Sequence, residues 1–101
     1  MYVFALLAAL FAEPVDLDTI TVEHARRLDG KPVVAGFVVS KPSYTLLGMT
    51  VLGAADRGDD IERGAVLDGN RLDVKEGERT VVVGTLFVFR HGATTVNGVF
   101  V

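Results

Sequence analysis

Cysteine is absent from this 101-residue chain, which excludes disulfide scaffolds and metal sites built on thiolates. Histidine occurs only twice, at His24 and His91, and neither has a second histidine four residues away, as a helical metal site requires. Without cysteine, a zinc site would need carboxylate ligands. The sequence therefore predicts no metal ion and no other cofactor.

Positive charge is also scarce. Ten lysine and arginine residues stand against thirteen aspartate and glutamate residues, which gives a net charge of -3 and an isoelectric point of about 5.2. The basic residues are scattered from Arg26 to Arg90, and their only cluster is the pair Arg26–Arg27. Because basic surfaces supply most of the affinity for phosphate backbones, this composition disfavours nucleic acid as a partner.

No apolar run is long enough to cross a bilayer. The longest, Met1–Ala12, falls short of the roughly 20 residues that a spanning helix needs. Its length and the polar boundary at Glu13 favour a secretory signal peptide over residues 1–12, although no basic residue precedes it. The mature protein is then periplasmic or extracellular, without a membrane span, and residues 13–18 form a short, loosely ordered leader. The alternative is a buried first helix or strand in a cytoplasmic protein.

Motifs of the common catalytic classes are missing. The only serines, Ser40 and Ser43, lie in a Ser-Lys-Pro-Ser segment typical of a turn, and no Gly-x-Ser-x-Gly elbow surrounds either of them. The chain also has no glycine-rich phosphate-binding sequence. We therefore expect a protein that is not an enzyme. The alternative is an unfamiliar active site at which His24, His91 and the acidic segment of the chain converge.

Residues 22–28 carry the signals of a short helix. Thr21 is a suitable N-cap, Glu23 lies in the first turn where it complements the helix dipole, and Asp29–Gly30 ends the pattern. Apolar residues recur at a spacing of three and form a narrow stripe. Because two turns of helix are not stable alone in water, we expect this helix to pack on other elements.

The rest of the chain is predicted to form β-strands because it is rich in valine, a residue type enriched in strands. Polar segments that contain proline or glycine separate the strands. The predicted strands cover residues 32–39, 44–52, 65–67, 80–90 and 95–101.

Two features favour closure of these strands into a barrel. The strand over residues 80–90 is apolar on both faces, whereas a strand of a one-layer antiparallel sheet would alternate. Interior glycines also interrupt the three best strands, at Gly36, Gly48 and Gly84, and barrels use such glycines to bend. The alternative is a two-layer sandwich. The predicted core contains Val33, Ala35, Phe37, Leu47, Met49, Val51, Val81, Val83, Leu86, Phe87 and Val88.

Two segments resemble strands of an OB-fold barrel. Asp29–Val39 is similar to the first OB strand, with its glycine in mid-strand, and Lys75–Leu86 is similar to a later strand entered through an acidic glycine turn. Residues 20–101 as a whole resemble small exported bacterial OB-like proteins. This resemblance implies a mainly β fold, namely a small five-stranded OB-like antiparallel barrel with one short N-terminal helix, as one domain over residues 19–101. Because Val101 ends an apolar run without a stop signal, the alternative is a truncated last strand.

Residues 56–62 form the most polar segment, with four carboxylates that could offer oxygen ligands to calcium. Their spacing does not match an EF-hand loop, and Arg57 and Arg63 lie among them. A solvated connection is the simpler interpretation, and an ion site is the alternative.

Together these observations favour a non-catalytic exported barrel that acts as a binding or envelope-interaction module for a protein or another envelope component. The alternative implied by the resemblance is binding of single-stranded nucleic acid or oligosaccharide on the strand face. Strand parity predicts Phe87 and Phe89 to be core residues rather than a stacking surface. The candidate ligand-face residues are Tyr44, Arg71, Lys75, Arg90 and His91.

Overall fold

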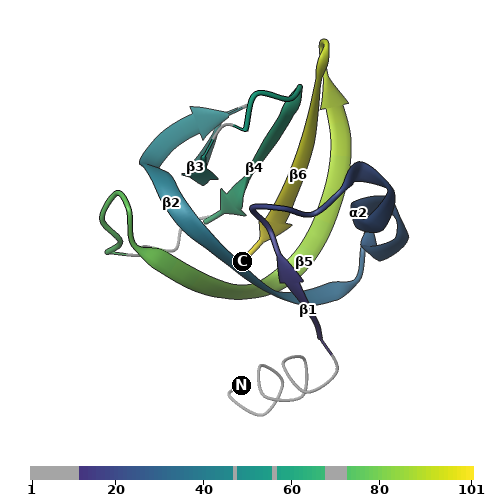
Figure 1. Ribbon diagram of the computed structural model, residues 1–101, viewed down its shortest axis with the longest axis horizontal. Helices are drawn as coiled ribbons and strands as arrows, with labels where there is room; N and C mark the ends of the chain where they lie inside the picture. The colour runs from purple at the N-terminus through teal and green to yellow at the C-terminus, as the bar shows by residue number, and fades with distance from the viewer. Residues whose placement is uncertain (1–11, 47, 56, 68–72) are drawn as a thin grey trace.

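The computed structural model describes residues 12–46, 48–55, 57–67 and 73–101. Along this part of the chain the elements are β1 (Glu13–Asp16), α2 (Val22–Leu28), β2 (Pro32–Leu46), β3 (Met49–Ala54), β4 (Ile61–Val66), β5 (Arg79–His91) and β6 (Thr94–Phe100). The long strands β2 and β5 curve around the molecule, and α2 lies beside β5 and β6 (Figure 1).

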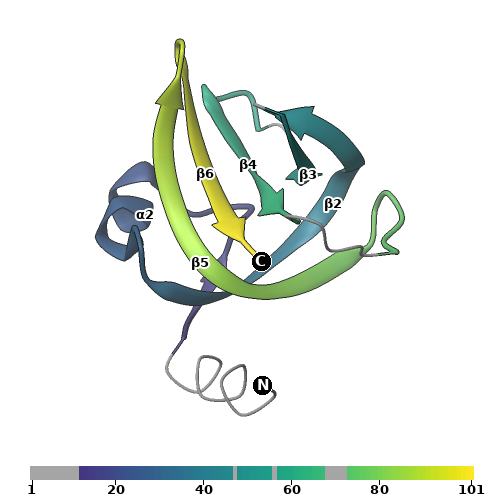
Figure 2. The same ribbon diagram turned by 180° about the vertical axis from the view of Figure 1, so that it is seen from behind.

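Strand β2 closes the sheet into a barrel. Its first half pairs antiparallel with β5, from Pro32 opposite Thr85 to Val38 opposite Arg79, and its second half pairs antiparallel with β3. The ring continues through β4 and β6 back to β5 (Figure 2). The predicted five-stranded barrel with one short helix is therefore confirmed. Its strand directions are mixed, because β4 and β6 run parallel, and this order is compatible with an OB-like fold.

The segment before the helix is ordered, contrary to the expected loose leader. Strand β1 pairs parallel with the first half of β2, from Glu13 opposite Val33 to Asp16 opposite Gly36. The Leu17 side chain that follows is fully buried in the core. This leucine anchors the segment because its apolar surface is removed from water.

Helix α2 forms over the predicted residues. The Thr21 hydroxyl accepts a hydrogen bond from the backbone N–H of His24 at 3.1 Å, as expected of an N-cap. Ala25 and Leu28 are the buried residues of the helix, and it packs on β5 and β6. Within the described part of the chain, no helix has the length and apolar character needed to cross a membrane.

The predicted boundary between the first two strands is wrong. Strand β2 continues through Ser40–Ser43 to Leu46, with register shifts against β3 on both sides of Lys41. Such β-bulges let one strand bend and turn the corner of a barrel. The chain reverses later, next to Gly48, which has a φ of +78° that favours glycine. Gly48 is therefore a turn residue, whereas Gly36 and Gly84 lie inside strands as expected.

The remaining strands agree better with the prediction. Strand β5 extends the predicted segment by one residue at each end, and β6 begins and ends one residue earlier than expected. Strand β4 begins four residues before the predicted short strand at residue 65. The acidic segment is therefore shorter than expected, because Ile61 and Glu62 already belong to β4.

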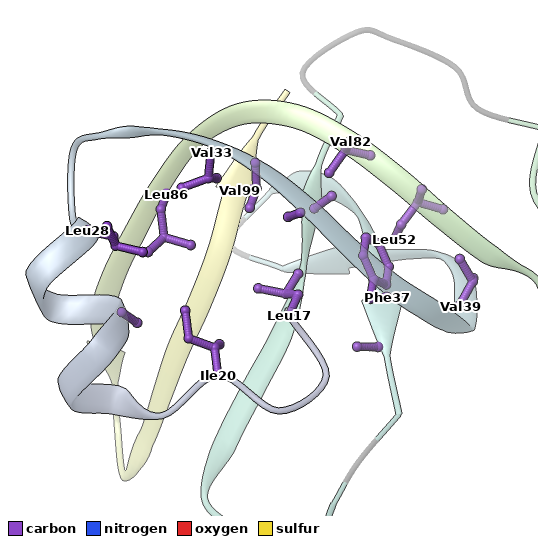
Figure 3. Packing of buried hydrophobic residues seen from close by; sticks show 14 of the residues in the cluster. Leu17, Ile20, Leu28, Val33, Phe37, Val39, Leu52, Val82, Leu86 and Val99 are labelled. Carbon is purple, nitrogen blue, oxygen red and sulfur yellow. The ribbon is translucent and has the colours of Figure 1, made fainter. Parts of the chain in front are cut away.

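The core fills the barrel and the space under α2 (Figure 3). Leu28 of the helix and Ile20 before it join the barrel residues Phe37 and Leu86 in one buried cluster. Five predicted core residues are buried: Val33, Ala35, Phe37, Val51 and Leu86. Val88 packs against the cluster from a partly buried position, Met49 is only half-buried, and Leu47 lies outside the described residues.

The prediction that the odd-numbered residues of β5 belong to the core is wrong, whereas the prediction for Leu86 is confirmed. Val82 and Leu86 point into the barrel, whereas Val81 and Val83 are 60% and 40% exposed. Phe87, which has the same parity as Val81, is also on the outer side and only half-buried. Because both faces of this strand are apolar, the local pattern does not distinguish the two orientations, which differ by a shift of one residue.

Candidate functional site

A cavity of about 170 Å³ opens where β2 bulges away from the end of β3. Its wall is formed by Lys41 and Tyr44 of β2, by the connection from β3 to β4, and by Glu62 and Arg63 at the start of β4. It is therefore bordered by residues of both charge signs and by one aromatic ring.

The bulges in β2 place Lys41 and Tyr44 on the same side of the sheet. Lys41 lies opposite Gly53 of β3, and Tyr44 lies opposite Val51, although three residues of β2 here match only two of β3. Residues opposite each other in an antiparallel pair share a face. The irregular register thus brings a cation and an aromatic ring together over β3.

Gly53 provides the space for this pair. A Cβ atom at this position would lie 2.7 Å from Tyr44 Cε1 and 3.2 Å from Lys41 Cβ, so a larger residue would displace the ring. The Lys41 Nζ atom lies 5.2 Å from the centroid of the Tyr44 ring. This distance is within the range of a cation–π interaction.

Tyr44 remains protonated at neutral pH, because its pKa is raised above the ordinary value. Partial burial, the negative charge of Glu62 and a hydrogen bond to the Glu62 side chain together raise the pKa of Tyr44 to about 12. Loss of the phenolic proton would place a second negative charge beside the carboxylate, which explains the direction of the shift.

One oxygen of the Glu62 carboxylate lacks a hydrogen-bond donor. Its Oε2 atom is buried and has no hydrogen-bond partner. The ion pairs within the described residues are His24 with Glu13 and Arg63 with Asp59, so neither involves Glu62. A buried carboxylate oxygen without a donor costs free energy, because it has lost its water without replacement.

Arg63 lines the cavity with an almost fully buried side chain. Its side chain is only 5% exposed, and its terminal nitrogens donate to both carboxylate oxygens of Asp59 at 3.0 and 3.2 Å. One of these nitrogens also reaches the Ile20 carbonyl oxygen at 3.5 Å. The Arg63 guanidinium lowers the pKa of Asp59 below its ordinary value, chiefly through these hydrogen bonds.

A second buried polar residue lies next to Arg63. Asn97 of β6 is the register partner of Arg63 in the parallel β4–β6 pair, and its side chain is fully buried. Neither amide atom of Asn97 has a hydrogen-bond partner, and neither has Arg63 Nε. These atoms form a polar spot inside an otherwise apolar barrel.

The outer face beyond the cavity carries a row of glycines and a cluster of aromatic rings. Gly53, Gly64 and Gly98 are register partners across β3, β4 and β6. Phe87 lies next to Gly98, stacks on Phe89 with ring centroids 5.4 Å apart, and contacts Phe100 at 4.4 Å. We call Phe87, Phe89 and Phe100 the outer aromatic cluster.

Of the four predicted ligand-face residues that the structure describes, one lines the cavity. Tyr44 lines it, whereas Lys75 and Arg90 are exposed at other positions. His91 is exposed at the β5–β6 turn, although its register partner Thr94 does line the cavity. Arg71 lies outside the described residues.

The sequence did not point to Lys41, and it indicated Glu62 only as one of four possible calcium ligands. Lys41 stands in a Ser-Lys-Pro-Ser segment that reads locally as a turn, and Glu62 closes an acidic segment that reads as solvated. No local sequence signal indicates that strand pairing in the barrel brings these two segments to one cavity, beside Gly53 and Tyr44. The two indications of this site in the sequence were Tyr44, as a ligand-face residue, and the acidic segment, as an alternative ion site.

The histidines and the acidic segment do not meet in one pocket. His24 Nε2 pairs with Glu13 Oε2 at 3.5 Å in a groove beside β1, whereas Asp59, Asp60 and Glu62 line the cavity at β4. No group of three or more acidic or histidine residues suited to a metal ion occurs among the described residues. The arrangement at the cavity is suited to hydrogen bonding and charge recognition.

Comparisons with known proteins give no family assignment: no family model, curated protein or solved structure matches this chain.

Proposed function

We propose that this protein is a non-catalytic binding module that receives part of its ligand in the cavity between Tyr44 and Glu62. The observation that carries the proposal is that Glu62 lines the cavity while its Oε2 atom is buried and has no hydrogen-bond partner. Polar groups left unsatisfied in this way are costly unless a ligand or solvent completes them. The neighbouring tyrosine hydroxyl and lysine offer further polar contacts.

Export remains part of the proposal. It is supported by the apolar run over residues 1–12 and the polar boundary at Glu13, which are typical of a secretory signal. In that setting the partner is a component of the cell envelope or of the extracellular medium. Immunoblotting of cell fractions and N-terminal sequencing of the mature protein test this point: a cytoplasmic protein that retains Met1 would contradict it.

A fragment screen by nuclear magnetic resonance tests the binding site. The full-length ¹⁵N-labelled protein is titrated with separate small amines, guanidines, sugars and carboxylates. We expect the amide signals of Tyr44 and Glu62 to shift with at least one class. Ala55→Phe should block the response, because exposed Ala55 borders the cavity. The matched variant Ala93→Phe changes an exposed alanine that does not line the cavity, and it should respond normally.

The proposal is wrong if no fragment class shifts these signals, or if the shifts gather on another face and survive Ala55→Phe. Thermal melting of both variants confirms that they remain folded.

The outer aromatic cluster favours a second candidate function, binding of a single-stranded nucleic acid or an oligosaccharide along the strand face. Aromatic rings on an outer sheet face provide stacking surfaces for bases. The acidic composition opposes nucleic acid. Titration of the protein with single-stranded DNA at low salt tests this candidate. Binding that is weakened by Phe87→Leu would favour it, and absence of binding would exclude nucleic acid as the ligand.

A further inference from the structure

We infer that the cavity recognises a positively charged group of its ligand, namely a primary ammonium or a guanidinium. This inference rests on the proposed binding function and specifies its chemistry. It follows from three properties of the cavity. The Glu62 carboxylate lacks a hydrogen-bond donor, the Tyr44 ring already interacts with the ammonium group of Lys41, and the charge and volume of the cavity suit a small cation.

The first property is the missing donor at Glu62. The buried Oε2 atom of Glu62 accepts no hydrogen bond, and no ion pair among the described residues involves Glu62. A carboxylate accepts hydrogen bonds and donates none, so the complementary group must be a donor. Bonds from charged donors are the strongest, which favours ammonium or guanidinium over a hydroxyl.

The second property is the aromatic ring. Lys41 Nζ lies 5.2 Å from the Tyr44 centroid, so the protein itself holds an ammonium group at this ring. A ligand cation would find the same attraction on the ring together with the free carboxylate oxygen. Lys41 then opposes binding of the ligand in two ways. It occupies the Tyr44 ring, and its positive charge repels a ligand cation.

The third property is the balance of charge and size. Arg63 is already neutralised by Asp59, which leaves Glu62 and Asp60 against Lys41 on the cavity wall. An anionic ligand would therefore meet net repulsion. The volume of about 170 Å³ is below the roughly 300–1,000 Å³ typical of sites that enclose whole small molecules. The cavity thus suits one head group of a longer ligand.

Binding of a tetralysine peptide and of spermidine to the full-length protein, measured by calorimetry and amide shifts, tests the inference. The same peptide with its N-terminus capped and all lysine side chains acetylated is the matched probe without a cation, because acetylation removes each positive charge. We expect tetralysine, spermidine or both to bind and the acetylated peptide to fail. Binding of the peptide alone would indicate a basic peptide as the source of the cation, and binding of spermidine alone a free polyamine.

Three variants localise the effect. Glu62→Gln keeps the shape of the side chain and should weaken binding about tenfold, as expected for loss of a hydrogen bond between charged groups. Glu23→Gln removes the same charge from exposed α2, away from the cavity, and should leave affinity unchanged. Lys41→Met removes the competing cation and should strengthen binding about threefold. Thermal melting verifies the fold of each variant.

The opposite results overturn the inference in distinguishable ways. Binding of inorganic phosphate that is lost in Lys41→Met, or of chitotetraose at the same amides, would refute the cation but retain the proposed binding function. Equal weakening by Glu62→Gln and Glu23→Gln would show attraction to net charge only. Absence of binding by every probe, together with a failed fragment screen, would overturn both proposals.

Discussion

The ring of Phe87 lies against Gly98 of the neighbouring strand, and the absence of a side chain at Gly98 is what permits this contact. The two residues are register partners in the β5–β6 pair, and a Cβ atom on Gly98 would collide with the ring, lying 2.8 Å from Phe87 Cε1. Phe87 in turn contacts Phe89 and Phe100. The outer aromatic cluster therefore depends on one glycine.

We predict that Gly98→Ala destabilises the protein by about 1–3 kcal/mol, because the added methyl group displaces Phe87 from its neighbours. Urea denaturation measures the change in free energy of unfolding. In a Phe87→Ala background the same substitution should cost much less, since no ring remains to be displaced. Equal costs in both backgrounds would show that the contact is not responsible.

The phenol of Tyr44 should titrate near pH 12, and Glu62→Gln should bring its pKa to between 10 and 12, because burial remains while the neighbouring charge is removed. Ultraviolet titration of tyrosinate in a Tyr2→Phe background isolates the signal. The native protein holds this proton more tightly than the unfolded chain. The contribution of Tyr44 to the free energy of unfolding is therefore fully present below pH 10, the pKa of the unfolded chain. It is lost as the pH rises through the folded-state pKa of about 12. An unchanged pKa in Glu62→Gln would contradict the contribution assigned to Glu62 and leave burial as the cause of the shift.

Ionisation of Asp59 makes the free energy of unfolding depend on pH in the opposite direction. Its pKa in the folded state is lower than the ordinary value of 3.8, so its contribution is present above pH 3.8 and is lost as the pH falls through the folded pKa. We expect Asp59→Asn to be less stable than the unmodified protein at pH 7 by no more than about 1 kcal/mol, since Asp59 is exposed to solvent.

This difference should disappear in acid, as followed by urea denaturation across the pH range. Asp60→Asn removes the same charge from the adjacent exposed residue and serves as the control, with an expected change below about 0.5 kcal/mol at pH 7. A difference for Asp59→Asn that persists at the lowest pH would contradict the assigned ion pair.

The polar spot formed by Asn97 and Arg63 predicts an internal water molecule. Fully buried polar groups beyond reach of protein partners are commonly satisfied by ordered water. Asn97→Leu should therefore destabilise the protein by about 1–3 kcal/mol, because it leaves Arg63 Nε without a bridge. Adding Arg63→Met should recover part of this loss. A high-resolution crystal structure would show the water, and an Asn97→Leu variant as stable as the parent would refute its role.

Local chemistry made the helix and β5 predictable. Thr21, Glu23 and Gly30 mark the ends of α2 through interactions that span one turn, so the predicted residues agree with the structure. The valine-rich stretch of β5 likewise specifies a strand by itself, because β-branched residues fit an extended backbone.

The candidate site was predictable only in part. Tyr44 was identified as a ligand-face residue, but Glu62 and Lys41 were not, because their proximity depends on a register shift in β2. The segment Ser40–Ser43 has the composition of a turn, yet barrel closure pairs it with β3 and overrides that preference. Parity in β5 was misassigned for a related reason: valines on both faces give no local indication of which face is inside.

The amino-acid sequence alone determined the positions of α2 and β5, the start of β2 and the absence of thiol chemistry, and its interior glycines and two-sided apolar strand indicated a closed sheet. The tertiary structure decided which side of β5 faces the core, where β2 bends, and that Tyr44, which packs on Gly53, lines the same cavity as Glu62. The division has a physical cause. Helix caps and strand propensities depend on residues close together in the sequence. The register of a strand, and the side of it that faces the core, are fixed only when distant strands pair and bury a common core.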